Sequence, residues 1–188
     1  DAAAVLAGLH EIIAEQIGEK AIYRQWLRER MQRDGFLTVT VKRDGEEKDA
    51  QGVYAQYYDY SELLKSLQTN TFRILAVNRG EKDGVLSVKI DFSEERMRHF
   101  IQIKERNGQG DSGEGYQVLL SAIDDAYKRF IQPAVARELR QELTVLAQGQ
   151  AIKVFGDNLY HLLMQAPLKN KIVMGFDPGF RTGSKLAI

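Results

Sequence analysis

Asp177 is the residue whose surroundings point most directly to chemistry, in the segment KIVMGFDPGFRTGSKLAI at residues 171–188. A short apolar run, residues 172–176, predicts a strand that ends just before this carboxylate. The Pro-Gly pair after it favours a turn, and residues 184–188 predict a returning strand. A carboxylate at the end of a buried strand can hold a divalent metal ion that activates water. A glycine-containing turn beside it can instead wrap the phosphates of a nucleotide.

The pattern around Asp177 leaves three interpretations open. It fits the first hairpin of an RNase H-like nuclease, where the carboxylate binds a metal ion that also steadies the leaving oxygen. It fits the actin and sugar-kinase group, where the same turn wraps nucleotide phosphates. A surface hairpin with an Asp-Pro-Gly turn is the third interpretation. Further carboxylates, or a second glycine-rich phosphate loop, would decide between the first two, and both would lie after Ile188.

Two other patterns could suggest catalysis or metal binding. GDSGEG, at residues 110–115, is similar to the GDSGG around the nucleophile of trypsin-like proteases. That chemistry needs a His and an Asp placed around the Ser on a many-stranded fold, whereas predicted helices surround this stretch, so we expect a loop. His10, His99 and His161 are far apart in sequence and lack HxxxH or HxH spacing. We therefore expect no metal site built on them.

Arginines and tyrosines offer candidates for nucleic-acid binding. Arg24 and Arg28 share one face of a predicted helix and could contact phosphates. A solvated helix face is the favoured alternative for this basic stretch. The segment YAQYYDYSELL, at residues 54–64, carries four tyrosines that could stack on bases. Its spacing favours core packing for Tyr57 and Tyr60 and leaves Tyr54 and Tyr58 as the more exposed pair.

Composition narrows the class of protein. The chain has 188 residues, of which 44% are apolar, so it can bury a core. Its 26 basic residues balance its 26 acidic ones, which does not indicate an electrostatic grip on nucleic acid by the whole surface. With no cysteine there is no disulfide and no cysteine nucleophile. The apolar runs fall far short of the roughly 20 residues that a membrane span needs. We interpret both ends as cuts, which would make the chain an internal fragment of a longer protein.

Hydrophobic periodicity predicts a chain made mostly of helices. Alternation predicts strands over residues 36–43 and 85–92. Pro133 should kink or break the helix around it. We expect two late stripes, around Tyr127 and Phe130 and around Phe155 and Leu159, to pack against each other as neighbouring helices. The predicted helices cover residues 5–17, 22–31, 53–67, 71–77, a stretch beginning at 93, 116–130, 135–146 and 152–163.

The closing segment resembles the opening of the YqgF-type, RNase H-like domain of the Tex family, the bacterial transcription accessory proteins. The residues that match the DPGFRTG-x-K signature of this family are Asp177, Pro178, Gly179, Phe180, Arg181, Thr182, Gly183 and Lys185. Residue 184 is Ser where many members have Cys. The preceding blocks also resemble the family: DYSELL (59–64), ILAVNRGE (74–81), AIDDAYKRFIQPAVARELR (122–140) and AIKVFGDNLYHLLMQAP (151–167). The likeness spans essentially the whole chain.

The resemblance implies a protein of several domains. In this family a helix-turn-helix region precedes the helical part, and YqgF, helix-hairpin-helix and S1 modules follow it. The implied role is in transcription through nucleic-acid binding, with the S1 module as the main RNA-binding element. The family is also similar to a eukaryotic transcription elongation factor. Asp177 then occupies the position of the first metal carboxylate of an RNase H-like fold, and its partners would lie beyond Ile188.

We therefore predict a mainly α, multi-helical fold with a few short strands. Residues 1–167 would be the central helical region of a Tex-like protein, and residues 171–188 the first hairpin of a truncated YqgF, RNase H-like α/β domain. The expected function is that of a cytoplasmic scaffold, without a cofactor, metal site or catalytic activity of its own. Its expected partners are nucleic acid and the transcription machinery, with no membrane; the alternative is a truncated RuvC-type nuclease. The candidate nucleic-acid-binding residues are Arg24, Arg28, Arg181 and Lys185.

Overall fold

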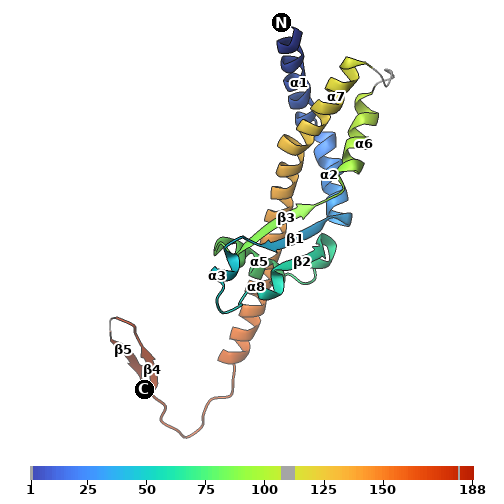
Figure 1. Ribbon diagram of the computed structural model, residues 1–188. Coiled ribbons are helices and arrows are strands. Elements are labelled where there is room, and N and C mark those ends of the chain that lie inside the picture. Colours follow the sequence, from blue (N-terminus) through green and yellow to red (C-terminus); the bar gives the residue numbers. More distant parts are fainter. Residues whose placement is uncertain (1, 107–112, 182) are drawn as a thin grey trace. The chain divides into compact units, whose positions relative to one another are not determined.

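The chain divides into two units, Asp1–Ala151 and Ile152–Ile188, in the computed structural model. The structure describes residues 2–106, 113–181 and 183–188. Helices make up most of it and a few short strands complete it, which confirms the predicted fold class (Figure 1). Among the described residues, no helix combines the length and the apolar character needed to cross a membrane.

Two helices open the first unit, α1 (Ala2–Glu19) and α2 (Ala21–Asp34). α1 lies beside α7 (Glu114–Asp125) and the π-helical segment η2 (Ala126–Ile131) that continues α7 (Figure 1). The approach is close at Gly18, where a Cβ atom would lie only 2.8 Å from Cβ of Phe130. α2 buries Tyr23, Leu27 and Met31, which recur at every fourth position on one face.

A small antiparallel sheet lies within this unit, in the order β2-β1-β3. Its strands are β1 (Phe36–Val41), β2 (Asp59–Leu63) and β3 (Leu86–Asp91). The two strands predicted from alternation are confirmed as β1 and β3. In β1 the alternate residues Leu37 and Val39 point into the core.

The single helix predicted over residues 53–67 is wrong. This stretch forms the short 3₁₀ helix η1 (Ala55–Tyr57), then β2, then α4 (Leu64–Leu67). Pairing of β2 with β1 outweighs the local helical spacing of its apolar residues. Tyr54 is buried instead of exposed, and its hydroxyl is satisfied by a hydrogen bond that it donates to Asp83 at 2.5 Å.

The loop before η1 is organised by a buried carboxylate. Asp49 follows the short helix α3 (Gly45–Lys48) and accepts hydrogen bonds from the backbone N–H groups of Val53, at 2.8 Å, and Tyr54, at 2.7 Å. The Tyr58 hydroxyl also donates to it, at 3.0 Å. Burial of the carboxylate is therefore offset by three hydrogen-bond donors, which hold this loop in an ordered turn.

Two further helices flank β3, namely α5 (Phe72–Lys82) before it and α6 (Glu94–Glu105) after it. Both fall where the sequence predicts helices, and α5 continues past the predicted residue 77. α5 packs closely on β3 at Gly80, where a Cβ atom would lie 2.5 Å from Cδ1 of Leu86. The turn between them uses Gly84 with a φ of 77°, a conformation that favours glycine.

A long helical run follows residue 113, because α7, η2 and α8 (Gln132–Leu163) succeed one another without a loop. The predicted break at Pro133 is wrong, because α8 continues through this residue. The predicted kink stays a prediction. Proline has no backbone N–H to donate to the preceding turn of a helix. The residues just before Pro133 adopt the wider π-helical spacing of η2, and the helix continues without a break. Along the run, every fourth residue is buried: Ile123, Tyr127, Ile131, Val135, Leu139, Leu143 and Ala147.

The packing predicted for Phe155 is also wrong. Phe155 and Leu159 belong to the same helical run as Tyr127, so the two stripes are not on neighbouring helices. Phe155 is 67% exposed, whereas Tyr127 is 2% exposed. An apolar stripe at helical spacing identifies a face of a helix, but it does not reveal what covers that face.

The second unit contains the end of α8 and a hairpin of β4 (Gly175–Pro178) and β5 (Ser184–Ala187). Both strands were predicted, although β4 begins three residues later than expected. All of the described side chains in this unit are exposed. The predicted domain bounds, 1–167 and 171–188, stay a prediction.

Candidate binding surfaces

The hairpin places Asp177 inside a strand, where the sequence put it just after one. Asp177 lies opposite Lys185 in the β4–β5 pairing, so the two side chains share a face. The turn is closed by the Gly179 N–H, which donates to the Gly183 carbonyl at 3.0 Å. Arg181 is exposed in this turn, and Thr182 lies outside the described residues. The cross-strand neighbour of the candidate metal carboxylate is thus a cation and not a second acid.

The two arginines singled out on α2 serve the fold. Arg24 donates from Nε to the carbonyl of Gly18 at 3.2 Å, where α1 ends. Arg28 forms ion pairs with two carboxylates of α8, Glu142 and, at 3.5 Å, Glu138. Their assignment to nucleic-acid binding stays a prediction, and any such contact by Arg28 would compete with its link between α2 and α8.

A group of possible metal ligands that the sequence did not indicate occurs between α1 and α7. Ligand atoms of His10, Glu11 and Asp125 lie within 4.8 Å of one another. Arg129 pairs with both carboxylates, at 3.3 Å to Asp125, and its hydrogen bond lowers the pKa of Glu11. His10 shares a hydrogen bond of 3.1 Å with Ser121. A guanidinium already neutralises these acids, so we assign no metal ion here.

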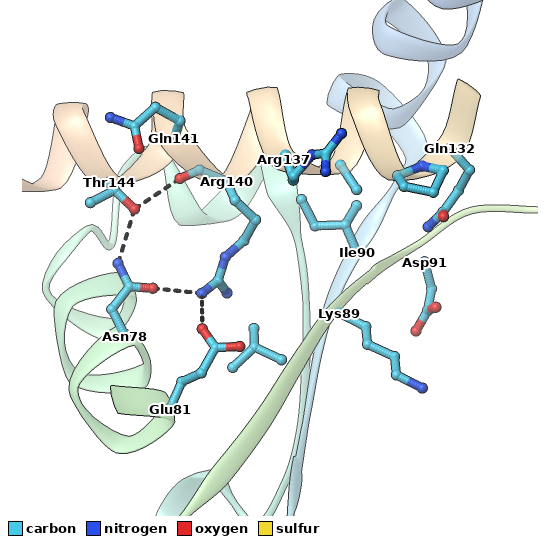
Figure 2. Close-up of a pocket in the computed structure, with 13 residues that line it drawn as sticks. Asn78, Glu81, Lys89, Ile90, Asp91, Gln132, Arg137, Arg140, Gln141 and Thr144 are labelled. Atoms are coloured by element: carbon cyan, nitrogen blue, oxygen red, sulfur yellow. Dashed lines mark hydrogen bonds and ion pairs between the residues drawn. The ribbon is translucent and has the colours of Figure 1, made fainter. Parts of the chain in front are cut away.

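A groove of about 810 Å³ runs between β3 and α8, and we call it the β3–α8 groove. Figure 2 shows α8 as one wall and β3 as the other, with α5 at one end. Four consecutive residues of β3 line the groove. Side chains of consecutive strand residues point to opposite faces of the sheet, so the β3 wall includes the edge of the strand. The lining residues are Asn78 and Glu81 from α5, Val88, Lys89, Ile90 and Asp91 from β3, and Gln132, Pro133, Ala136, Arg137, Arg140, Gln141 and Thr144 from α8.

Hydrogen bonds fix one end of the groove. Arg140 donates from Nη2 to Asn78 at 2.8 Å and to Glu81 at 2.7 Å (Figure 2). The Asn78 amide donates to the Thr144 hydroxyl at 2.9 Å, and that hydroxyl donates to the Arg140 carbonyl at 2.8 Å. Burial lowers the pKa of Arg140, and the nearby Glu81 carboxylate opposes this shift. The Arg140 Nη1 is buried and has no hydrogen-bond partner among the described residues.

The remaining charges give the groove an excess of positive charge. Lys89 and Arg137 are exposed and, within the described part of the chain, no ion pair or hydrogen bond involves their side chains. Glu81 is paired with Arg140, which leaves Asp91 as the other carboxylate of the lining. Sequence reasoning missed this groove because its two walls are far apart in the chain, and only the strand order shows which edge of the sheet lines it.

Comparison with known proteins identifies the family. A family model described as Tex central region-like matches residues 1–155. An uncharacterised protein of Bacillus subtilis, YdcI, is 39% identical over 97% of this chain and 25% of its own length. The human S1 RNA-binding domain-containing protein 1 is 31% identical over 96% of this chain and 19% of its own length. The transcriptional accessory protein Tex of Neisseria gonorrhoeae is 28% identical over the whole chain and 25% of its own length.

The first unit is mainly helical and contains a small antiparallel sheet. The chain belongs to the Tex family, of which it matches the central region. It spans a quarter or less of the curated relatives cited above. The resemblance inferred from DPGFRTG and the preceding blocks is thereby confirmed.

Proposed function

We propose that the chain is a helical scaffold of a cytoplasmic, Tex-like transcription accessory protein, and that its own contribution to nucleic-acid binding is weak. The names of its relatives support the broader role, because one is called a transcriptional accessory protein and another an S1 RNA-binding domain protein. The transcription machinery is the corresponding partner.

The scaffold role is supported mainly by one observation: several arginines form ion pairs that link different helices and strands. Arg28 joins α2 to α8, and Arg129 joins η2 to α1. Arg140 joins α8 to α5, and Arg73 joins α5 to Glu62 of β2. A phosphate that approaches one of these guanidiniums would compete with the carboxylate already paired to it. Strong electrostatic binding of nucleic acid would therefore disturb the packing of the body.

We further propose that this chain is not an enzyme. A metal ion held by Asp177 would have one protein carboxylate, with Lys185 beside it in the pairing. Magnesium occupies sites with few protein ligands mainly when substrate phosphates complete the coordination. The RuvC-type nuclease remains the alternative, and it requires carboxylates beyond those of this hairpin.

Nucleic-acid affinity tests the scaffold role. Fluorescence anisotropy with labelled single-stranded RNA, single-stranded DNA and duplex DNA should give dissociation constants of roughly 10⁻⁴–10⁻⁶ M that weaken as salt is raised. The human S1 RNA-binding domain-containing protein 1, named for an RNA-binding domain, is the comparison and should bind RNA more tightly. Sub-micromolar binding by the 188-residue chain that survives raised salt would contradict the proposal, because it would show that the chain itself recognises nucleic acid specifically.

Cleavage assays test the absence of catalysis. The same labelled strands, incubated with magnesium and with manganese, should stay intact with the chain and with its Asp177→Ala variant. The variant should also keep the weak affinity of the original chain. Cleavage by the chain that disappears in Asp177→Ala would overturn this part of the proposal, because it would place a working site in the hairpin.

A further inference from the structure

The wall of the β3–α8 groove formed by β3 is a free strand edge. In the order β2-β1-β3, strand β3 pairs with β1 on one side, and within the described residues no strand pairs with its other side. Such an edge presents a row of N–H and C=O groups that can pair with another chain.

Register tells which backbone groups face the groove. The Lys42 N–H donates to the Val85 carbonyl at 2.9 Å, one step beyond the β1–β3 pairing. Hydrogen-bonded positions alternate in an antiparallel pair, so Ser87, Lys89 and Asp91 direct their backbone groups to β1. Val88 and Ile90 therefore direct theirs away from β1, towards the side where the groove lies.

We propose that the β3–α8 groove binds an extended acidic peptide of a partner protein, which adds as a strand to β3. Such peptide binding combines main-chain hydrogen bonds with side-chain specificity from alternate residues. This inference is independent of nucleic-acid binding. A peptide is favoured over nucleic acid because only a peptide backbone repeats donors and acceptors at the spacing of a strand edge.

The α8 wall supplies the preference for acidic side chains. Alternation places the side chains of Val88 and Ile90 on the core face of the sheet, the face on which α8 lies in Figure 2. Alternate residues of an added strand would point to that same face. There they would meet Arg137, which has no described partner, and Arg140, whose Nη1 is unsatisfied. On the opposite face Lys89 and Asp91 offset each other, so the charge preference comes from α8.

The probe is a peptide of about seven residues in which Thr and Glu alternate, acetylated and amidated at its ends, a typical strand length. Titrated into the ¹⁵N-labelled 188-residue chain, it should bind and slow hydrogen exchange at the amides of Val88 and Ile90. The amide of Lys89, already bonded to β1, should change less. A peptide in which Lys replaces Glu should not bind.

Two N-methylated forms of the peptide separate strand addition from general charge attraction. Methylation at the even positions removes one set of backbone donors, and methylation at the odd positions removes the other. One form should lose binding and the other should keep it, because one set faces β3 and the other faces solvent. Equal affinity of the two forms would overturn the proposal.

Variants of the chain test the two walls. Arg137→Glu should weaken peptide binding about tenfold, whereas Lys128→Glu, an exposed cation outside the groove lining, should leave it unchanged. Val88→Pro removes the backbone N–H of one residue on the free edge and should abolish peptide binding. The variant should still fold, because proline is tolerated on the free side of an edge strand. If that variant fails to fold by circular dichroism, Arg137→Glu and the methylated peptides still decide the outcome.

Other occupants would give different results. Protection of Val88 and Ile90 by a single-stranded oligouridylate, without peptide binding, would assign the groove to nucleic acid and overturn the proposal. Protection that instead rises with protein concentration, together with dimerisation in sedimentation, would assign the edge to a second copy and would also overturn it.

Discussion

The two units of the chain carry the same kind of apolar pattern and bury it to opposite extents. In the first unit, residues 116–130 repeat apolar side chains at helical spacing, and Ile123 and Tyr127 are almost fully buried. In the second, residues 152–163 repeat them in the same way, yet Phe155 and Leu162 are 67% and 61% exposed. Periodicity reports that a helix has an apolar face, and the neighbouring elements decide whether that face contributes to stability.

Truncation of one apolar side chain in each unit should give the largest difference. Ile123→Ala should lower the free energy of unfolding by about 2–5 kcal/mol, because it leaves a cavity in a fully buried site. Phe155→Ala should change it by less than about 0.5 kcal/mol, because the ring is exposed. Urea denaturation followed by circular dichroism measures both. A Phe155→Ala cost as large as that of Ile123→Ala would mean that another surface covers Phe155 in solution.

Alanine substitution at one glycine in each unit should give a smaller difference in stability between the two units. Gly80→Ala should destabilise the chain by about 1–3 kcal/mol, because its Cβ would lie 2.5 Å from Leu86 Cδ1 and 3.0 Å from Tyr54. Gly156→Ala, with nothing within 4 Å of the added atom, should stabilise α8 by up to about 1 kcal/mol. Thermal melts of both variants should therefore move in opposite directions. A neutral Gly80→Ala would show that α5 and β3 can separate without cost.

Alkaline pH should weaken the first unit through its buried tyrosines. Burial raises the pKa of Tyr127 to about 12, above its ordinary value near 10. A raised pKa means that the folded state favours the neutral phenol, so this contribution is complete below pH 10 and is lost as pH rises towards 12. The loss should reach about 1 kcal/mol near pH 11. Denaturation curves at pH 9 and 11 should show a smaller drop for Tyr127→Phe, and an equal drop would contradict the assignment.

The ion pair between α2 and α8 should have the smallest effect. Both Arg28 and Glu142 are partly exposed, at 38% and 46% of their side chains. A double-mutant cycle of Arg28→Ala and Glu142→Ala should therefore give a coupling energy of only about 0.2–1 kcal/mol, reduced by salt. A larger value would mean that the link between these helices is a main source of rigidity in the body.

Local sequence signals predicted the elements that depend on local structure. The helices α1 and α2 and the strands β1 and β3 lie close to their predicted positions, because helical periodicity and strand alternation are local signals. β2 was missed because Tyr60 is also at helical spacing from Tyr57 and Leu64, and only pairing with β1 selects the strand. The break at Pro133 was expected from its missing N–H, but a local rule does not foresee that the preceding turns widen instead.

The role of each candidate site residue depends even more on partners that are distant in the sequence. The DPGFRTG motif identified the family, yet the pairing of Asp177 with Lys185 required the register of the hairpin. Arg28 stood out as a free cation in sequence because Glu138 and Glu142 come more than a hundred residues later. The β3–α8 groove had no sequence signal, since its edge exists only once β3 takes an outer place in the sheet.

Because every fourth residue along the α7–η2–α8 run is buried, the exact number of residues in this run determines which side chains face the core. An α-helix turns about 100° per residue, so a repeat of four advances the buried side by about 40° each time. The wider turns of η2 absorb part of that advance. The helix therefore presents one side near Ile123 and another near Ala147. One residue inserted between Ile123 and Leu139 would rotate Leu139 and Leu143 by about 100° relative to Ile123, off the core, and an insertion in a surface loop has no such effect.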